Sequence, residues 1–207
     1  MSDYLSDEEQ VDRIKQWWSE NGMTIVVSLF GAIIGVVGWN WYESRSEERS
    51  AAAFNVYAEY LEQRKLSGSQ DSALKNLDEE YEGSAYHTFT LFFRAKDAVD
   101  SDDFEGALRY LNLAVDTTND GSLKDIALLR LSKIQMQMEA FESALQSLSM
   151  MRGGGYKAVV AELTGDIYYS QGKIELAKEA YQAGLDGLSD SDAAGLLRLK
   201  HSSLVVE

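Results

Sequence analysis

The sequence predicts an all-α protein with a single N-terminal transmembrane helix. After this helix we expect an α-solenoid of about three to four helix pairs, closed by a C-terminal capping helix. Three observations lead to this prediction. Residues 21–42 contain no acidic or basic side chain, and the chain contains no proline, which would break helices. Beyond residue 49 small residues recur at nearly constant intervals, as in stacked helical repeats.

Residues 21–42 are predicted to cross a membrane. As a helix, this stretch rises about 33 Å, which is close to the hydrocarbon thickness of a bilayer. All four tryptophans flank it, with Trp17 and Trp18 before it and Trp39 and Trp41 at its end. Indole rings favour the headgroup boundary of a membrane. The alternative is a buried helix of a soluble domain, which would not need tryptophan at both ends.

The same stretch is predicted to stay attached as an anchor. A secretory signal has a short basic start and a small-residue cleavage site. Here the preceding 20 residues hold six acids and two bases, and the apolar run ends at residues 38–42 without such a site. Arg13 and Lys15 precede the span and Arg45 and Arg49 follow it, so the positive-inside count is equal on both sides and does not set the orientation.

The tail before the span is predicted to contain a short amphipathic helix on the membrane surface. Ser6 and Glu9 have the spacing of a capping box at a helix start. Val11, Ile14, Trp17 and Trp18 then fall on one helical face.

The predicted division is an acidic tail at 1–20, a span at 21–42 and a domain at 43–207. Of the formal charge of −15, the tail carries −4 and the domain carries −11. Such a domain repels nucleic acid and anionic headgroups, and the same acidity also favours solubility. Because there is no cysteine, a disulfide framework and thiol catalysis are excluded.

Small residues of the span share one face. They fall within an arc of about 80° on a helical wheel and are Ser28, Gly31, Gly35 and Gly38. Small residues spaced in this way let a second helix approach closely. Glycine is also common in transmembrane helices without such a role, but we favour a helix-packing face that contacts a partner in the membrane.

Beyond the span, one 21-residue segment at 165–185 resembles a tetratricopeptide repeat. Its matching positions are Gly165, Tyr168, Gly172, Ala177 and Tyr181. Weaker copies centre on Ala107 and Ala144, and a fainter pair surrounds Tyr57, Leu61, Gly68, Ala73 and Leu77. The alanines predicted at helix crossings, Ala73, Ala107, Ala144 and Ala177, are 34, 37 and 33 residues apart. Residues 191–204 are predicted to form the capping helix.

The whole chain, from about Tyr4 onward, resembles the YfgM family. The residues that carry the resemblance are Glu9-Gln10-Val11, Ile14-Lys15, Trp17-Trp18, Glu20-Asn21-Gly22, Gly38-Trp39, Trp41, Leu129-Arg130-Leu131, Ile134-Gln135, Gly153-Gly154-Gly155-Tyr156 and Val160-Ala161-Glu162-Leu163-Thr164-Gly165-Asp166. The proline that often ends a tetratricopeptide repeat is absent.

This resemblance implies a single-span protein of the bacterial inner membrane, with a cytoplasmic N-terminus and a tetratricopeptide-like periplasmic domain. It also implies an ancillary subunit of the SecYEG translocon that pairs with the membrane-anchored chaperone PpiD. Such proteins are expected to help exported clients reach periplasmic folding factors.

No catalytic, cofactor or metal site is expected. His87 and His201 are the only histidines and lie 114 residues apart, whereas a two-histidine metal site needs short spacing. His87 is interpreted as a residue of a helix surface or edge. The glycines at 153–155 lack the strand and the Gly-Lys-Ser/Thr of a phosphate loop, so we interpret them as a hinge between helices.

A groove along the first helices of the pairs is the remaining candidate site. Repeat register predicts its lining as Phe89, Phe92, Lys96, Ile126, Leu129, Lys133, Met136, Val159, Glu162 and Tyr169. Several of these residues could instead pack inside the solenoid, and the sequence leaves both interpretations open.

The main functional hypothesis is a non-enzymatic membrane adaptor at the export channel. The alternative is a membrane-tethered scaffold or regulatory protein whose acidic cytoplasmic tail contacts a regulator. An enzyme is the third and weakest hypothesis.

Overall fold

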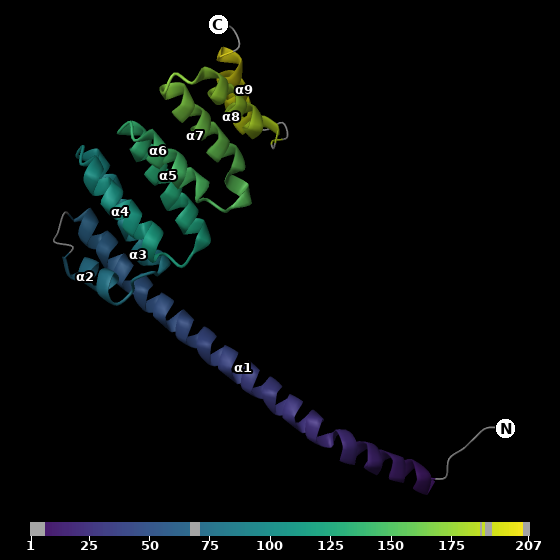
Figure 1. Cartoon of the computed structure of the whole chain (residues 1–207). Helices are drawn as coiled ribbons and strands as arrows, with labels where there is room; N and C mark the ends of the chain where they lie inside the picture. The colour runs from purple at the N-terminus through teal and green to yellow at the C-terminus, as the bar shows by residue number, and fades with distance from the viewer. Residues whose placement is uncertain (1–6, 67–70, 187, 189–191, 205–207) are drawn as a thin grey trace. The chain divides into compact units, whose positions relative to one another are not determined.

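The computed structural model describes residues 7–66, 71–186, 188 and 192–204 (Figure 1). Within these residues the chain is helical and contains no strand, which confirms the all-α prediction. The helices are α1 (Asp7–Lys65), α2 (Asp71–Glu79), α3 (Ala85–Asp100), α4 (Phe104–Thr117), α5 (Gly121–Gln137), α6 (Phe141–Ser149), the 3₁₀ turn η1 (Gly154–Tyr156), α7 (Lys157–Ser170), α8 (Ile174–Asp186) and α9 (Asp192–Ser203).

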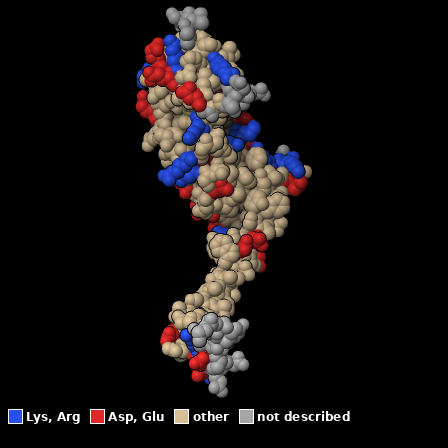
Figure 2. Space-filling model, turned by 90° about the vertical axis from the view of Figure 1, so that its right-hand side faces the viewer, with Lys and Arg blue, Asp and Glu red and all other residues tan. Residues whose placement is uncertain are grey.

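The chain divides into two compact units, Met1–Ala51 and Ala52–Glu207. The described part of the first unit is helical from Asp7 to its end and belongs to α1. Figure 2 shows an uncharged stretch along this helix between charged ends, and α1 is long and apolar enough to cross a membrane. Within this chain, every side chain from Met23 to Ala51 is exposed.

The amphipathic helix predicted before the span is not a separate element. Val11, Ile14 and Trp17 lie in the first turns of α1, which continues without a break into the apolar stretch. Good helix formers before the span allow this continuity, because no glycine or proline interrupts residues 7–21. Ser6, the predicted capping residue, lies outside the described residues.

The second unit is built from consecutive helix pairs. The end of α1 packs with α2, and the pairs α3–α4, α5–α6 and α7–α8 follow before the single helix α9. Figure 1 shows α3 to α9 following one another in chain order. This is the predicted solenoid with its capping helix, observed at Asp192–Ser203.

The core is divided into clusters that each connect neighbouring pairs. Tyr60 of α1 packs with Ala73 and Leu77 of α2, and Phe93 of α3 packs against this cluster. Leu91, Leu111 and Leu128 join α3, α4 and α5, Leu148 and Ile167 join α6 to α7, and Tyr181 and Leu197 join α8 to α9. Each pair is therefore completed by the next one, as expected when a pair cannot bury its own apolar face.

The alanines predicted at helix crossings are buried. Ala73 is 1% exposed, and Ala107, Ala144 and Ala177 are 0% exposed. A methyl group at these positions lets the neighbouring helix approach closely. The faint first pair is thus a real helix pair, although Gly68 lies outside the described residues.

The turns inside the pairs repeat one geometry. Asp102, Glu139 and Gly172 have positive φ angles of 60°, 60° and 71°. The residue after each of these donates its N–H to the carbonyl oxygen five residues before it. The N···O distances are 2.8 Å for Asp103, 2.8 Å for Ala140 and 2.9 Å for Lys173. This is the hydrogen bonding of a Schellman-type helix end.

Candidate binding groove

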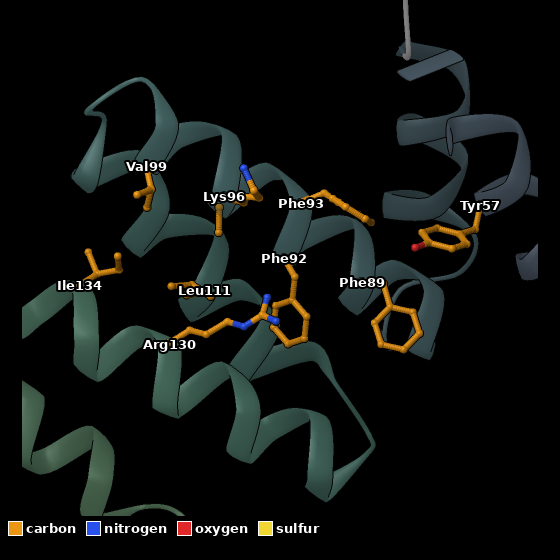
Figure 3. Close-up of a pocket in the computed structure, with 10 residues that line it drawn as sticks. Tyr57, Phe89, Phe92, Phe93, Lys96, Val99, Leu111, Arg130 and Ile134 are labelled. Carbon is orange, nitrogen blue, oxygen red and sulfur yellow. The ribbon is translucent and has the colours of Figure 1, made fainter. Parts of the chain in front are cut away.

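A pocket of about 640 Å³ lies within the second unit, between the end of α1, α3, α4 and α5 (Figure 3). Its lining residues are Tyr57, Phe89, Phe92, Phe93, Ala95, Lys96, Val99, Leu111, Arg130 and Ile134. Eight of these are apolar or aromatic, and only Lys96 and Arg130 carry charge. A pocket of this size and composition suits an apolar ligand group placed by a few polar contacts.

The aromatic wall of the pocket comes from α1 and α3. The ring centroids of Tyr57 and Phe89 are 6.2 Å apart, and Tyr57 also lies 5.5 Å from Tyr86. Phe92 is only 7% exposed and belongs to the core cluster of α3, α4 and α5. The wall is thus held in place by core packing at Phe92 and by aromatic contacts at Phe89.

Arg130 reaches into the pocket from α5. Its guanidinium lies 4.3 Å from the centroid of the Phe92 ring, and Figure 3 shows the two side chains together in the middle of the pocket. Burial lowers the pKa of Arg130 below its usual value, because a charged group loses hydration there. The contact with the ring is a cation–π interaction.

Other cations near the pocket have carboxylate partners. Arg64 pairs with Asp97, and Lys96 pairs with Asp100 one helical turn away. The hydrogen bonds from Arg64 hold the pKa of Asp97 below its usual value. These pairs neutralise charge along α1 and α3.

A further polar cluster joins α2 to α3. Asp78 lies 3.1 Å from the Arg94 guanidinium and 3.4 Å from His87 Nε2. His87 is 1% exposed, so its interpretation as a helix surface residue is wrong. The Gly83 N–H donates a hydrogen bond to His87 Nδ1, with an N···N distance of 3.4 Å. Burial acts to raise the pKa of Asp78, but the contacts with His87 and Arg94 outweigh it and the pKa is lowered.

Three of the predicted groove residues line this pocket, namely Phe89, Phe92 and Lys96. On α5 the predicted residues lie elsewhere. Leu129 and Met136 are half-buried against the cluster of α6 and α7, Ile126 packs against the preceding cluster, and Lys133 is exposed. Their role in binding stays a prediction.

Arg130 and Ile134 were missed because two helical registers are possible on α5. The series 126, 129, 133, 136 and the series 126, 130, 134 both have helical spacing, and the repeat register selected the first. Tyr57, Phe93, Val99 and Leu111 were also missed. The signal that could have found Arg130 is a single cation within the apolar run Ile126–Leu131.

Of the predicted groove residues of α7, Glu162 contacts the capping helix. Val159 and Tyr169 are exposed, whereas Glu162 is 2.6 Å from Lys200 Nζ on α9. Lys200 also lies 2.8 Å from Asp166, which accepts a 2.8 Å hydrogen bond from the Tyr181 hydroxyl. Lys200 of α9 is therefore joined by charge to Glu162, one of the predicted groove residues, and to its neighbour Asp166.

The small residues predicted to form a contact in the membrane are open within this chain. Ser28 is exposed, and a Cβ atom placed on Gly31, Gly35 or Gly38 would meet nothing within 4 Å. The space beside these residues is large enough for a second helix to approach the backbone.

A helix long and apolar enough to cross a bilayer, followed by stacked helix pairs, defines the class of membrane-anchored helical-repeat proteins. The sequence model of the tetratricopeptide repeat-like domain matches residues 15–206. The chain is similar to the ancillary SecYEG translocon subunit of Haemophilus influenzae, with 32% identity over 86% of this chain and 88% of that protein. The protein of the same name in Escherichia coli is 26% identical over the full length of both chains.

A third relative, from Aggregatibacter actinomycetemcomitans, carries the same name and is 31% identical over 86% of this chain and 88% of that protein. The chain therefore belongs to the tetratricopeptide repeat-like family of these subunits, the YfgM family. With its apolar N-terminal helix, it is a membrane-anchored protein.

Proposed function

We propose that this chain is an ancillary subunit of the SecYEG translocon and acts there as a non-enzymatic adaptor. One observation carries the proposal. The similarity to the Escherichia coli subunit covers both chains completely, so it includes the apolar helix as well as the repeats. A shared repeat domain alone would support only a general role in protein binding.

The proposed topology has a cytoplasmic tail at 1–20, a span at 21–42 and a periplasmic domain at 43–207. Large domains cross the membrane largely regardless of their charge, so the acidity of this domain is compatible with export. Protease added to spheroplasts should digest the domain while the tail stays protected. Survival of the domain until the membrane is lysed would contradict this orientation.

The proposed adaptor uses two contacts. In the membrane, the face of Ser28, Gly31, Gly35 and Gly38 packs against a helix of the translocon or of a PpiD-like chaperone. In the periplasm, the pocket defined above binds a protein segment. Exported clients would then pass from the channel to the chaperone while both are held close together.

Affinity purification from crosslinked membranes tests this proposal. The wild-type chain should recover SecY and the PpiD-like chaperone. Gly31→Leu with Gly35→Leu should reduce this recovery at least severalfold, because leucine keeps the span apolar but blocks close helix approach. Val26→Leu with Val37→Leu is the matched control, since both valines are exposed and lie on the helix face opposite the small residues.

A groove variant separates the adaptor from a passive tether. Phe89→Ala with Ile134→Ala removes apolar surface from two sides of the pocket while adding no charge. The adaptor is supported if this variant folds and inserts but no longer recovers the chaperone in the purification. Undiminished recovery of every partner would leave the span as the contact and the repeats as a scaffold.

A further inference from the structure

Arg130 and Lys133 form an exposed basic face on α5 that the described residues do not neutralise. The helix holds Lys124, Arg130 and Lys133, and its one acid is Asp125. Asp125 is 5% exposed, and its carboxylate accepts hydrogen bonds from the N–H groups of Arg152 and Gly153 at 3.0 and 2.7 Å. This carboxylate is therefore committed to the loop after α6 and is turned away from the basic face.

Arg130 differs from the other cations around the pocket. Arg64, Arg94 and Lys96 each pair with an aspartate. For Arg130, no carboxylate partner exists among the side chains that the structure describes, and its contact is with the Phe92 ring. The residue as a whole is exposed, but one face of its guanidinium is covered by the Phe92 ring inside the pocket. A partly desolvated cation without an anion is a favourable place for an incoming carboxylate.

The position of Arg130 sets the shape of the expected ligand. Figure 3 shows its guanidinium in the middle of the pocket, with Val99 and Ile134 toward one end and Phe89 and Tyr57 toward the other. Apolar subsites therefore lie on both sides of the cation. A carboxylate at a chain end would leave one of these subsites empty, whereas an acidic side chain inside a segment can fill both.

We propose that the pocket binds an internal segment of a partner protein in which an aspartate or glutamate lies between large apolar side chains. Arg130 receives the carboxylate in a two-pronged hydrogen bond, and the apolar neighbours of that acid pack at the two ends of the pocket. This inference rests on the proposed function, since it specifies the chemistry of the segment that the adaptor binds. It also gives a role to a basic face in a chain with a formal charge of −15.

Peptide binding to the full-length chain in nanodiscs of zwitterionic lipid tests the proposal. The probe is a fluorescent peptide with both ends blocked, in which a central glutamate has leucine and phenylalanine on each side. A second peptide has glutamine in place of glutamate. A third has the glutamine and a free terminal carboxylate. Fluorescence anisotropy should show that the glutamate peptide binds about tenfold more tightly than either other peptide, which corresponds to about 1.4 kcal/mol.

Two variants assign this preference to Arg130. Arg130→Gln should bind the glutamate and glutamine peptides equally, and Arg130→Lys should retain a smaller preference because lysine keeps the charge without the planar fork. Lys133→Gln is the matched control on the same helix and should retain the tenfold preference. The preference should also shrink as salt is raised. Circular dichroism melting establishes that each variant is folded.

Equal binding of the first two peptides to the wild-type chain would overturn the proposal, as would a preference that survives in Arg130→Gln. Absence of binding by all three peptides would overturn it as well. Tighter binding of the third peptide would show that the carboxylate comes from a chain end. These results are independent of SecY recovery by the wild-type chain, so the carboxylate preference can fail while the translocon assignment stands.

Discussion

At the scale of residues, the closest helix contacts depend on glycine, which has no side chain. Gly165 on α7 faces Tyr181 on α8, and a Cβ atom at Gly165 would overlap the tyrosine ring. Tyr181 is 3% exposed and its hydroxyl donates a hydrogen bond to Asp166. The ring is therefore held by packing against α7 and by the hydrogen bond of its hydroxyl, and it has little room to move.

Gly165→Ala should destabilise the repeat unit by about 1–3 kcal/mol, because the added methyl group forces the Tyr181 ring out of its packed position. Thermal or urea denaturation followed by circular dichroism measures the change. Gly121→Ala is the matched control, since Gly121 lies at the start of α5 and a Cβ there meets nothing within 4 Å. The control should stay within about 0.5 kcal/mol of wild type or become slightly more stable. Equal losses from both substitutions would refute the overpacking argument.

At the scale of elements, the sequence predicts helices better than the turns between them. The crossings at Ala107, Ala144 and Ala177 could be predicted because alanine recurs there at a nearly constant interval. The turns inside the pairs could not be predicted in the same way, because among their positive-φ residues only Gly172 is a glycine, the residue type that favours positive φ. Asp102 and Glu139 adopt the same conformation, and each is held by the hydrogen bonds that close its helix end.

The candidate site was predictable only in part, and α5 explains why. Helical periodicity identifies this helix as amphipathic but does not say which neighbour each stripe faces. Leu129 packs toward α7 and Arg130 toward α3. Packing between the helix pairs decides which stripe lines the pocket. A single sequence does not contain this information.

One lysine links the capping helix α9 to α7. Lys200 Nζ lies 2.6 Å from Glu162 and 2.8 Å from Asp166, and all three side chains are less than one third exposed. Burial acts to lower the pKa of Lys200, but the hydrogen bonds that its ammonium donates to both carboxylates outweigh it and the pKa is raised. Charge thus joins α9 to α7 beside the apolar contact of Leu197.

Lys200→Met should weaken the repeat unit by about 1–3 kcal/mol, because two half-buried carboxylates lose their cation. Hydrogen exchange should increase in α9 more than in α3. Lys75→Met is the matched control, since Lys75 is 69% exposed and lies 4.0 Å from Glu79. If α9 amides exchange as slowly in Lys200→Met as in the control, the ion cluster does not hold the cap.

The same cluster predicts a dependence on alkaline pH. A group whose pKa is raised by folding contributes stability that is present below its unfolded pKa, near 10.5 for lysine. That contribution is lost as the pH rises through the folded pKa. Between pH 9 and 11.5, melting temperatures should therefore fall more steeply for wild type than for Lys200→Met. Parallel curves would show that Lys200 has the same pKa in both states.

At the scale of the whole molecule, the two compact units have different surroundings. The first is an apolar helix whose side chains from Met23 to Ala51 are exposed within this chain. The second contains all four core clusters, and no residue of these clusters precedes Val56. The repeats therefore bury their apolar surface without help from the predicted span, whereas the span depends on a membrane to cover it.

The fragment 43–207 should consequently be soluble without detergent, strongly helical by circular dichroism and close to the full-length chain in melting temperature. The full-length chain, by contrast, should sediment with membranes after alkaline carbonate washing and should require detergent for extraction. Ultracentrifugation of both proteins, followed by melting of the fragment in buffer and of the full chain in nanodiscs, makes the comparison. An aggregated fragment, or one that melts far below the full chain, would mean that residues before 43 complete the repeat core. The division into an independent anchor and an independent domain would then be wrong.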